Sequence, residues 1–377
     1  MVWLLCIVAA LWVAAAVHDT LAVAQLATLP ARRPLAPAAE VTVVMAVRDD
    51  AAHIEASIAL LLRQQHVRLQ LVVVDDRSSD GTNAALARVA EHDPRVKVLT
   101  IDELPPDWLG KTHALQVGAH DATTPWLLFT DGDARLAPDA LARAIDAAEL
   151  ANAQHVSLLP THRDTTLLGR ACLLAFQLVI QRRIAAVNAT KQRTYVGTGA
   201  FNLVRTDAYR AIGGHLPLRL EVLDDVWLGG LLFRAGYRSR VWFAANDLAI
   251  DWGRTPRDLV RVTTKNMFAI LRFHTLLTVV AIVAVVALLA FTFVAPCLHS
   301  LGWLPLAAYG MCAVPGMHLA RRMNWSLLAG LMVPLGRVLL PIALANSLWV
   351  TLRQGGVRWR GTFYPLAQLR RGQVTSR

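Results

Sequence analysis

The sequence predicts a membrane-bound α/β protein whose mainly parallel sheet has helices on both faces. Between residues 40 and 270, short apolar runs alternate with amphipathic stretches of helical period, which is typical of such a sheet. Long uncharged runs flank this region on both sides. The 377 residues are 55% hydrophobic with a mean hydropathy of +0.41, which is high for a chain that lies wholly in water.

Residues 1–30 are predicted to form an N-terminal transmembrane anchor. Met1–Val17 carries no charge, and no Lys or Arg precedes Arg32. A cleaved signal peptide would begin with a basic segment, so we expect the anchor to be retained. The Arg32-Arg33 pair then places the N-terminus outside and the following region in the cytoplasm by the positive-inside rule. The chain is therefore expected in the cell membrane, with several spans.

The region 40–270 is predicted to be a cytoplasmic α/β domain. Strands are expected at Val41–Val47, Leu71–Val74, Val96–Thr100, Trp126–Thr130 and His155–Leu159. The helices expected between them cover Ala52–Gln65, Ala84–Glu91, Lys111–Ala119 and Pro138–Ala151. Ligands bind to such sheets at the carboxyl ends of the strands, where the strand order reverses. Functional side chains are therefore sought at those ends.

Asp75 and Asp76 end one of these strands, in 71-LVVVDDRSSDGT-82. Two ionised carboxylates repel each other and resist desolvation, so core packing does not explain them. The Ser-Ser-Asp-Gly sequence that follows is typical of a tight turn into a helix. The pair is therefore predicted to serve a ligand.

Asp131 and Asp133 follow the next such strand, in 126-WLLFTDGDARLAPDAL-141. A turn at Gly132 would direct both carboxylates towards one ion. Carboxylate oxygens suit Mg²⁺ or Mn²⁺ that also coordinates a diphosphate. An Asp-Gly-Asp turn on the surface is the alternative, and the position at a strand end favours the metal.

Two further motifs lie closer to the C-terminus. The loop Gly197-Thr198-Gly199 would either let a substrate approach the backbone or form an ordinary turn. The pair Asp224-Asp225 begins a helix, and Asp224 would be a suitable cap for it. Capping does not explain Asp225, which precedes an apolar helix face.

Residues 275–352 are predicted to form a C-terminal membrane region. Spans at 275–298 and 301–320 are expected to form a hairpin. The third stretch, 326–352, contains helix-breaking prolines on both sides of Arg337, which is costly inside a bilayer. A re-entrant or interfacial element is favoured there over a full span.

A re-entrant element leaves residues 353–377 as a basic cytoplasmic tail. Its aromatic residues Trp359, Phe363 and Tyr364 are expected at the level of the lipid head groups. The net charge of +11 comes mainly from arginine. We expect no nucleic-acid partner, because no basic helix with interleaved aromatic residues occurs. The four cysteines are too widely spaced to indicate a disulfide framework or a zinc site.

Six motifs occur in the order typical of one family: 43-VVMAVRDD-50, 73-VVDDRSSDGT-82, 109-LGKTHAL-115, 129-FTDGDA-134, 197-GTGAFNLVR-205 and 223-LDDVWLG-229. Together they resemble a membrane-bound family 2 glycosyltransferase, whose nucleotide-diphospho-sugar transferase domain has the GT-A type fold. The tail 357-VRWRGTFYPL-366 and the spans resemble a bacterial lipid-glycosylating branch. That branch includes the hopene-associated and diaponeurosporenoate-type enzymes and, more distantly, ceramide glucosyltransferase.

The resemblance implies a role for each matched residue. The nucleotide-sugar donor would be bound by Asp50, Asp75, Asp76, Lys111 and Asp131, with Lys111 near the diphosphate. Asp133 and Asp131 would hold Mg²⁺ or Mn²⁺, and Asp225 would be the catalytic base with Asp224 beside it. Residues expected to contact the acceptor or the diphosphate are Gly199, Asn202, Lys265 and Asn266.

The function implied is the inverting transfer of one sugar to a membrane lipid. The lipid would be a hopanoid, a carotenoid, a sphingolipid-like molecule or a polyprenyl lipid. Processive relatives carry a Gln-x-x-Arg-Trp signature, which residues 251–271 lack. Single transfer is therefore favoured over polysaccharide synthesis.

A nucleotidyltransferase and a non-catalytic membrane scaffold are also compatible with this type of fold. A nucleotidyltransferase usually has a Gly-rich loop after the first strand, and 45-MAVRDDAAH-53 has no glycine. A scaffold would be expected to lose at least one acidic pair, and all three pairs are present. Both functions are therefore less favoured than sugar transfer.

Overall fold

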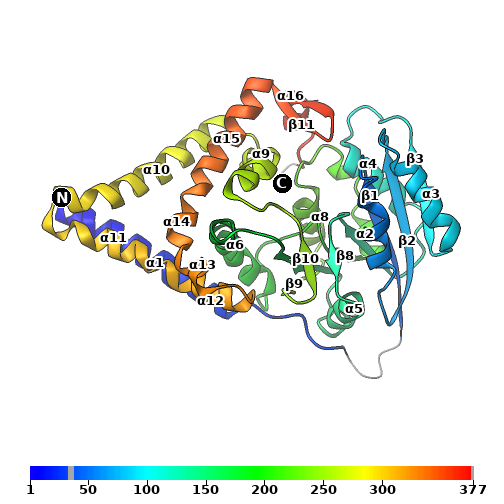
Figure 1. Cartoon of the computed structure of the whole chain (residues 1–377), viewed down its shortest axis with the longest axis horizontal. Coiled ribbons are helices and arrows are strands. Elements are labelled where there is room, and N and C mark those ends of the chain that lie inside the picture. Colours follow the sequence, from blue (N-terminus) through cyan, green and yellow to red (C-terminus); the bar gives the residue numbers. More distant parts are fainter. Residues whose placement is uncertain (33–37, 375–377) are drawn as a thin grey trace. The chain divides into compact units, whose positions relative to one another are not determined.

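The computed structural model describes residues 1–32 and 38–374, which Figure 1 shows as a ribbon. The chain divides into two compact units. The first, here called the membrane unit, contains residues 1–26, 162–185 and 252–358. The second, here called the sheet unit, contains residues 27–161, 186–251 and 359–377. The predicted tail 353–377 is divided, since residues 353–358 belong to the membrane unit and residues 359–377 to the sheet unit.

The sheet unit is built on a seven-stranded sheet with the order β3-β2-β1-β4-β8-β6-β9. Its strands are β1 (Ala39–Val47), β2 (Val67–Asp76), β3 (Val96–Ile101), β4 (Trp126–Thr130), β6 (His155–Leu159), β8 (Asn202–Arg205) and β9 (Ser239–Phe243). Neighbouring strands are parallel except at β8, which runs antiparallel to both β4 and β6. The predicted α/β class with a mainly parallel sheet is confirmed.

Helices cover both faces of this sheet because side chains of a strand alternate between faces. Val43 and Met45 of β1 pack on one face with α2 (Ile54–Leu61), α3 (Thr82–His92) and α5 (Ala140–Leu150). Val44 points to the other face, where the helices are α4 (Gly110–Ala119), α7 (Thr206–Ala211) and α8 (Asp224–Arg234). Burial on both faces accounts for the nearly continuous apolar runs of the central strands.

The strand register brings the predicted acidic motifs to one edge. Val47 at the end of β1 pairs with Asp75, and Met45 pairs with Thr130 at the end of β4. The loops that follow β1, β2 and β4 therefore leave the sheet from the same side.

The remaining strands form two small sheets. The first contains β5 (Arg135–Leu136), β10 (Leu248–Ile250) and β7 (Thr161–His162). The second contains β11 (Gly356–Trp359) and β12 (Thr362–Pro365) and is followed by α16 (Leu366–Arg371). Arg360 and Gly361 join β11 to β12, and both have positive φ, as a tight two-residue hairpin turn requires.

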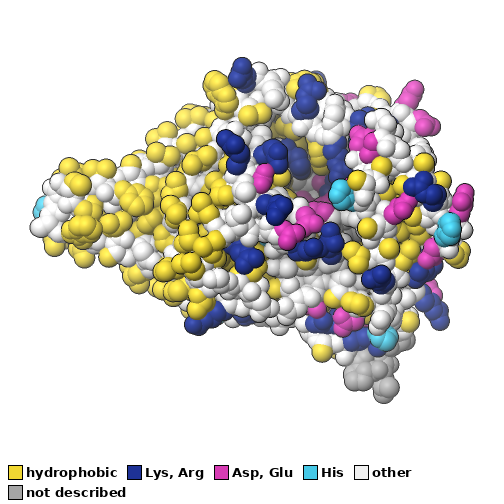
Figure 2. All heavy atoms as spheres, in the orientation of Figure 1, with side chains coloured by type: hydrophobic (Ala, Val, Ile, Leu, Met, Phe, Trp, Pro, Cys, Tyr) yellow, Lys and Arg dark blue, Asp and Glu magenta, His cyan; other side chains and the backbone are white. Residues whose placement is uncertain are grey.

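The membrane unit contains helices long and apolar enough to cross a bilayer. Four such segments occur among the described residues: α1 (Val2–Ala24), α6 (Leu167–Asn188), α10 (Thr275–Leu298) and the segment Val333–Gln354. Figure 2 shows hydrophobic side chains gathered on the surface of α10 and its neighbours, where leucines and valines are exposed. The sequence analysis missed α6 because Arg170, Arg182 and Arg183 interrupt its apolar pattern.

The membrane unit also has shorter helices. They are α9 (Pro256–Ile270), α11 (Trp303–Gly310), α12 (Ala313–Arg322), α13 (Leu327–Leu331), α14 (Val333–Arg337) and α15 (Leu339–Gln354). Of these, α14 and α15 together make up the segment Val333–Gln354. The predicted span over 301–320 contains two consecutive helices, α11 and α12, separated at Met311 and Cys312. The predicted proline-interrupted stretch is divided into α13, α14 and α15.

Arg337, a costly residue in an apolar segment, lies beside Asp19 of α1. The Asp19 carboxylate is buried and accepts hydrogen bonds from Arg337 Nη2 at 2.5 Å and Arg182 Nε at 2.6 Å. Three segments of the membrane unit therefore meet at one ionic cluster. Opposite charges in direct contact offset the cost of desolvating each group.

We predict that Asp19→Asn lowers the free energy of unfolding by about 3 kcal/mol, because it leaves two arginines without their carboxylate at nearly constant shape. Chemical denaturation in detergent micelles measures the change. Asp164→Asn is the matched control, since Asp164 is exposed and belongs to the same unit. Equal small losses in both variants would contradict a stabilising role for the Asp19 cluster.

Candidate active site

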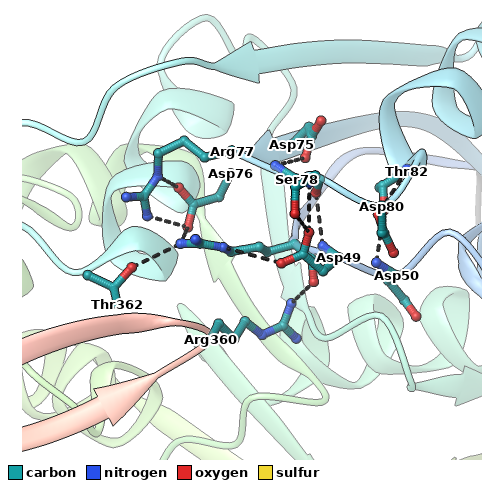
Figure 3. Close-up of polar contacts among 12 residues, drawn as sticks. Asp49, Asp50, Asp75, Asp76, Arg77, Ser78, Asp80, Thr82, Arg360 and Thr362 are labelled. Atoms are coloured by element: carbon teal, nitrogen blue, oxygen red, sulfur yellow. Dashed lines mark hydrogen bonds and ion pairs between the residues drawn. The ribbon is translucent and has the colours of Figure 1, made fainter.

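The loops after β1 and β2 interlock through short hydrogen bonds, which Figure 3 shows. Asp49 N donates to Ser78 Oγ at 2.9 Å, and the Asp49 carboxylate accepts from Ser79 N at 2.7 Å. Asp50 N donates to Thr82 Oγ1 at 2.8 Å. The backbone of Asp50 is thereby fixed, and its carboxylate lies beside Gly132, since a Cβ on Gly132 would be 3.5 Å from Asp50 Oδ2. The motif after β1 and the Asp-Gly-Asp motif after β4 are thus neighbours.

The Asp75-Asp76 pair is buried, and the charge of Asp76 is compensated locally. Arg77 donates to both oxygens of Asp76, at 2.7 and 3.1 Å, and a nitrogen of Arg48 lies 4.0 Å from the same carboxylate. Hydrogen bonding to Asp76 raises the pKa of Arg77. Asp75 accepts from Ser78 N at 3.3 Å. These contacts explain how two adjacent carboxylates end a buried strand.

The start of α4 is held between Asp76 and the C-terminal tail. A Cβ on Gly110 would overlap with Asp76 Oδ2, so a larger residue here would displace the Asp76 carboxylate from its present position. Gly110 N donates to the hydroxyl of Tyr364 at 3.0 Å. Tyr364 is 5% exposed, which corrects the prediction that it lies at the lipid head groups. A contact between residues 254 positions apart leaves no local sequence signal.

The tail makes further contacts with the loop after β1. Arg48 Nη1 donates to Thr362 Oγ1 at 3.0 Å, and Arg360 Nη1 donates to the carbonyl oxygen of Arg48 at 3.1 Å. Figure 3 shows both tail residues near the carboxylates of the loop after β1 and of the end of β2. The tail is therefore part of this edge of the sheet unit.

Lys111 follows Gly110 and connects the acidic motifs of β4 and α8. Its Nζ lies 2.8 Å from Asp131 Oδ1 and 3.7 Å from Asp224 Oδ2. Burial opposes the charge on Lys111, but Asp131, Asp224 and Asp225 together raise its pKa above the ordinary value. The lysine is therefore a fixed cation among three carboxylates.

Asp133 follows Gly132 in the sequence and is the second carboxylate of the Asp-Gly-Asp motif. Asp133 is exposed to solvent. Desolvation by the atoms around its carboxyl and the charge of Asp131 raise the pKa of Asp133 to about 6. A cation near Asp133 would favour the ionised form of its carboxyl and so lower its pKa.

Asp225 is held through its backbone at the start of α8. Its carbonyl oxygen accepts from Asn202 Nδ2 at 3.1 Å, and Asn202 Oδ1 lies 2.6 Å from His155 Nε2. His155 Nδ1 lies 3.0 Å from Ser239 Oγ. Burial lowers the pKa of His155 to about 4, so the ring is neutral at physiological pH. The sequence analysis found Asn202 but missed His155, which is one of twelve dispersed histidines.

The glycine loop allows backbone and side chains of the site to approach each other. A Cβ on Gly197 would lie 1.8 Å from the carbonyl oxygen of Asp225, and one on Gly199 would lie 2.4 Å from Asp131 Oδ2. Gly199, Asn202, Lys111 and Asp225 line one small cavity of about 10 Å³. Close packing within the protein thus accounts for both glycines.

The predicted site residues in the sheet unit therefore gather at one edge. Lys265 and Asn266 instead belong to α9 of the membrane unit, where Lys265 Nζ donates to Asn266 Oδ1 at 3.0 Å. No group of three or more His, Cys, Asp or Glu side chains that could hold a metal ion occurs in residues 1–32 and 38–374. The candidate ligands for Mg²⁺ or Mn²⁺ are therefore the two carboxylates of Asp131 and Asp133. Two carboxylates suffice for an ion that also binds substrate phosphates.

Residues 42–213 match the model of glycosyl transferase family 2. They form a glycosyl transferase family 2 domain. Mannosyltransferase PcManGT from Pyrobaculum calidifontis, solved in complex with GDP-Man and Mn²⁺, has a similar fold. The similarity has a TM-score of 0.55 at 20% identity and covers 93% of this chain and 99% of that one. The domain thus has a GT-A-like fold, as predicted.

Curated relatives match shorter segments. The chain is 36% identical over 115 residues to succinoglycan biosynthesis protein ExoO of Rhizobium meliloti (strain 1021), which is 30% of this chain and 31% of that protein. It is 37% identical over 75 residues to 4,4'-diaponeurosporenoate glycosyltransferase of Staphylococcus haemolyticus (strain JCSC1435). These 75 residues make up 20% of this chain and 19% of that protein. The chain thus matches less than a third of the length of these relatives.

We predict that Tyr364→Phe lowers the free energy of unfolding of the sheet unit by about 1–3 kcal/mol, because the buried Gly110 N–H loses its acceptor. Phe363→Leu is the matched control on the same strand, since Phe363 is 40% exposed. Hydrogen exchange at the Gly110 amide measures the local effect. Unchanged exchange in Tyr364→Phe would show that the tail does not stabilise the start of α4.

Proposed function

We propose that this chain transfers one sugar, with inversion, from a nucleotide-diphospho-sugar to a membrane lipid. The observation that carries the proposal is the position of Lys111 between Asp131 of the β4 loop and Asp224 of α8. A fixed cation beside several carboxylates suits a substrate that has both a diphosphate and a reacting hydroxyl. The family 2 domain and its GT-A-like fold support this choice of reaction.

The loops after β1 and β2 would bind the nucleotide end of the donor. Asp50 has its backbone fixed by Thr82 and its carboxylate directed towards Gly132. Asp75 and Asp76 are fixed by the neighbouring turn. Such preorganised acceptors suit the hydroxyls of a ribose and the N–H groups of a base.

Lys111 would contact the diphosphate, because its charge is retained by the surrounding carboxylates. When bound by Asp131 and Asp133, Mg²⁺ or Mn²⁺ would neutralise charge on the leaving diphosphate. Lys111 would then exchange its ion pair with Asp131 for one with a phosphate oxygen. Asp224, which is buried beside Lys111, would hold the ammonium group in place.

Asp225 is the better candidate for the base, since it is partly exposed whereas Asp224 is buried. Its carboxylate would take the proton of the acceptor hydroxyl while the hydroxyl oxygen forms a bond to the anomeric carbon. The bond between that carbon and the diphosphate oxygen breaks at the same time, and its electron pair leaves with the diphosphate. Attack from the opposite side inverts the configuration.

A lipid acceptor is supported by the apolar helices of the membrane unit. The similarity to a diaponeurosporenoate glycosyltransferase points to the same class of acceptor. We propose a multi-pass protein of the cell membrane, with the sheet unit and the tail in the cytoplasm. The second candidate function is polysaccharide synthesis, which the similarity to a succinoglycan biosynthesis protein favours. A product with several sugars per acceptor would support that second candidate.

We predict that Asp225→Asn lowers the transfer rate by about 10²–10⁴-fold, because the amide keeps the shape but cannot accept the proton. Donor affinity should change little. Rate and affinity are measured separately on purified protein with radiolabelled sugar nucleotides and a membrane lipid extract.

The matched control is Asp207→Asn in α7, where the carboxylate is exposed. A near-normal rate in Asp225→Asn would show that the base lies elsewhere. Loss of donor binding alone would assign Asp225 to the donor site instead.

A further inference from the structure

A row of buried polar side chains crosses three neighbouring strands and ends at the backbone of Asp225. Its members are Ser239 of β9, His155 of β6 and Asn202 of β8, and each residue is at most 2% exposed. Ser239 Oγ lies 3.0 Å from His155 Nδ1, and His155 Nε2 lies 2.6 Å from Asn202 Oδ1. Asn202 Nδ2 then donates to the carbonyl oxygen of Asp225 at 3.1 Å. Three strands are thus linked to the first turn of α8.

The carbonyl at the end of the row fixes the direction of every hydrogen bond in it. The Asp225 carbonyl oxygen can only accept, so Asn202 must direct its NH₂ group towards it and its Oδ1 towards His155. Because Oδ1 also only accepts, His155 must donate from Nε2. Burial lowers the pKa of His155 to about 4, so at neutral pH the ring is uncharged and carries one proton. Nδ1 is therefore an acceptor, and the Ser239 hydroxyl donates to it.

The row lies in apolar surroundings, where an unpaired polar group is costly. His155 is directly opposite Val204 in the sheet register, and Val204 packs with Leu228 of α8 in the apolar cluster on this face. Loss of one partner would leave a buried donor or acceptor unsatisfied, at a cost of about 1–3 kcal/mol. Each member of the row therefore holds the next one in a single orientation.

Two glycines let α8 approach the row closely. A Cβ on Gly229 of α8 would lie only 3.2 Å from His155 Cε1, and a Cβ on Gly197 would overlap with the carbonyl oxygen of Asp225. A larger side chain at either position would displace the start of α8 from the sheet. The ring of His155 thus packs directly beneath the helix that carries Asp225.

The carboxylate of Asp225 is oriented by its own helix. Its Oδ1 accepts from the backbone N–H of Val226 at 2.8 Å, in the first turn of α8. The carbonyl held by Asn202 belongs to the same residue, so the row fixes the backbone from which this carboxylate projects. Misplacement of a reacting group by about 1 Å can lower a rate by about 100-fold. Loosening the row would therefore lower the rate of a reaction in which Asp225 takes part.

We propose that His155 is a positioning residue for sugar transfer, because its donation from Nε2 holds the Asn202 amide in the orientation that fixes Asp225 beside the acceptor hydroxyl. The proposal rests on the proposed role of Asp225 as the base and identifies a residue that keeps this base in place. His155 is fully buried, whereas Asn202 lines the small cavity together with Asp225. His155 therefore acts through Asn202 and not on a substrate.

The first test measures the transfer rate at saturating donor and the donor Kd separately in His155→Leu. Leucine fills much of the space of the ring but donates no hydrogen bond, so the Asn202 amide is free to rotate. We expect the rate to fall about tenfold or more while the donor Kd stays within about twofold of wild type. His155→Gln, whose amide can again donate to Asn202, should retain most of the rate.

Thr42→Val is the matched control, since it removes a buried hydroxyl of the same unit that lies 2.8 Å from Thr124 Oγ1. Its rate should stay within about twofold of wild type, because it is independent of the row. Thermal unfolding is measured for both variants. Equal rate losses in His155→Leu and Thr42→Val would reduce the effect to general destabilisation and overturn the proposal.

A double variant tests whether the effect passes through Asp225. In Asp225→Asn the proton acceptor is already absent, so adding His155→Leu should lower the residual rate by no more than about twofold. Fully additive losses would show that His155 acts elsewhere and overturn the proposal. A near-normal rate in Asp225→Asn alone would remove the base, and the positioning role would fall with it.

The tautomer of His155 is measured independently of catalysis, by nitrogen NMR of the full chain labelled with isotopic histidine in detergent micelles. The signals of His155 are those missing from His155→Gln. We expect a protonated Nε2 and an unprotonated Nδ1 at neutral pH, and a proton on Nδ1 would overturn the proposal even if His155→Leu folds poorly. Absence of sugar transfer in wild type with the expected tautomer would count against the proposed function, whereas the opposite tautomer in active protein would count against the positioning role alone.

Discussion

The site depends on one electrostatic constraint, which is that several carboxylates crowded at one edge of a sheet must be compensated before a substrate arrives. Lys111 does this for Asp131 and Asp224, and Arg77 does it for Asp76. Both ion-pair clusters lie at the start of α4. There Gly110 has no side chain that would displace the Asp76 carboxylate, and its N–H donates to the Tyr364 hydroxyl. The first turn of α4 therefore connects Asp76 with the Lys111 cluster of the candidate site.

The same constraint operates in the membrane unit with a different result. Asp19 is compensated by Arg182 and Arg337, and this cluster joins segments that the sequence separates by hundreds of residues. Here the compensated charges hold segments of the fold together, whereas in the sheet unit they lie at the candidate site.

The fold class, and the meeting of the acidic motifs at one edge, could be predicted because their signals are local. Buried strands have continuous apolar runs, and parallel strands bring their carboxyl ends to one edge, so the acidic motifs had to meet. The antiparallel β8 has only four residues and gives little signal. The contacts of Tyr364, His155 and Asp19 join distant segments, so no local pattern reveals them. The long helix α6 was missed because arginines interrupt its apolar run.

The most direct test is a calorimetric titration of wild type and Lys111→Met with Mn²⁺, first alone and then with a panel of sugar nucleotides. In wild type the ammonium group of Lys111 is paired with Asp131 and would compete with Mn²⁺ for this carboxylate. The account predicts that Lys111→Met binds Mn²⁺ more tightly in the absence of nucleotide. It also predicts that the variant binds the sugar nucleotide about tenfold more weakly, since a charged contact to the diphosphate is lost. Binding of both ligands as in wild type would contradict the central role of Lys111.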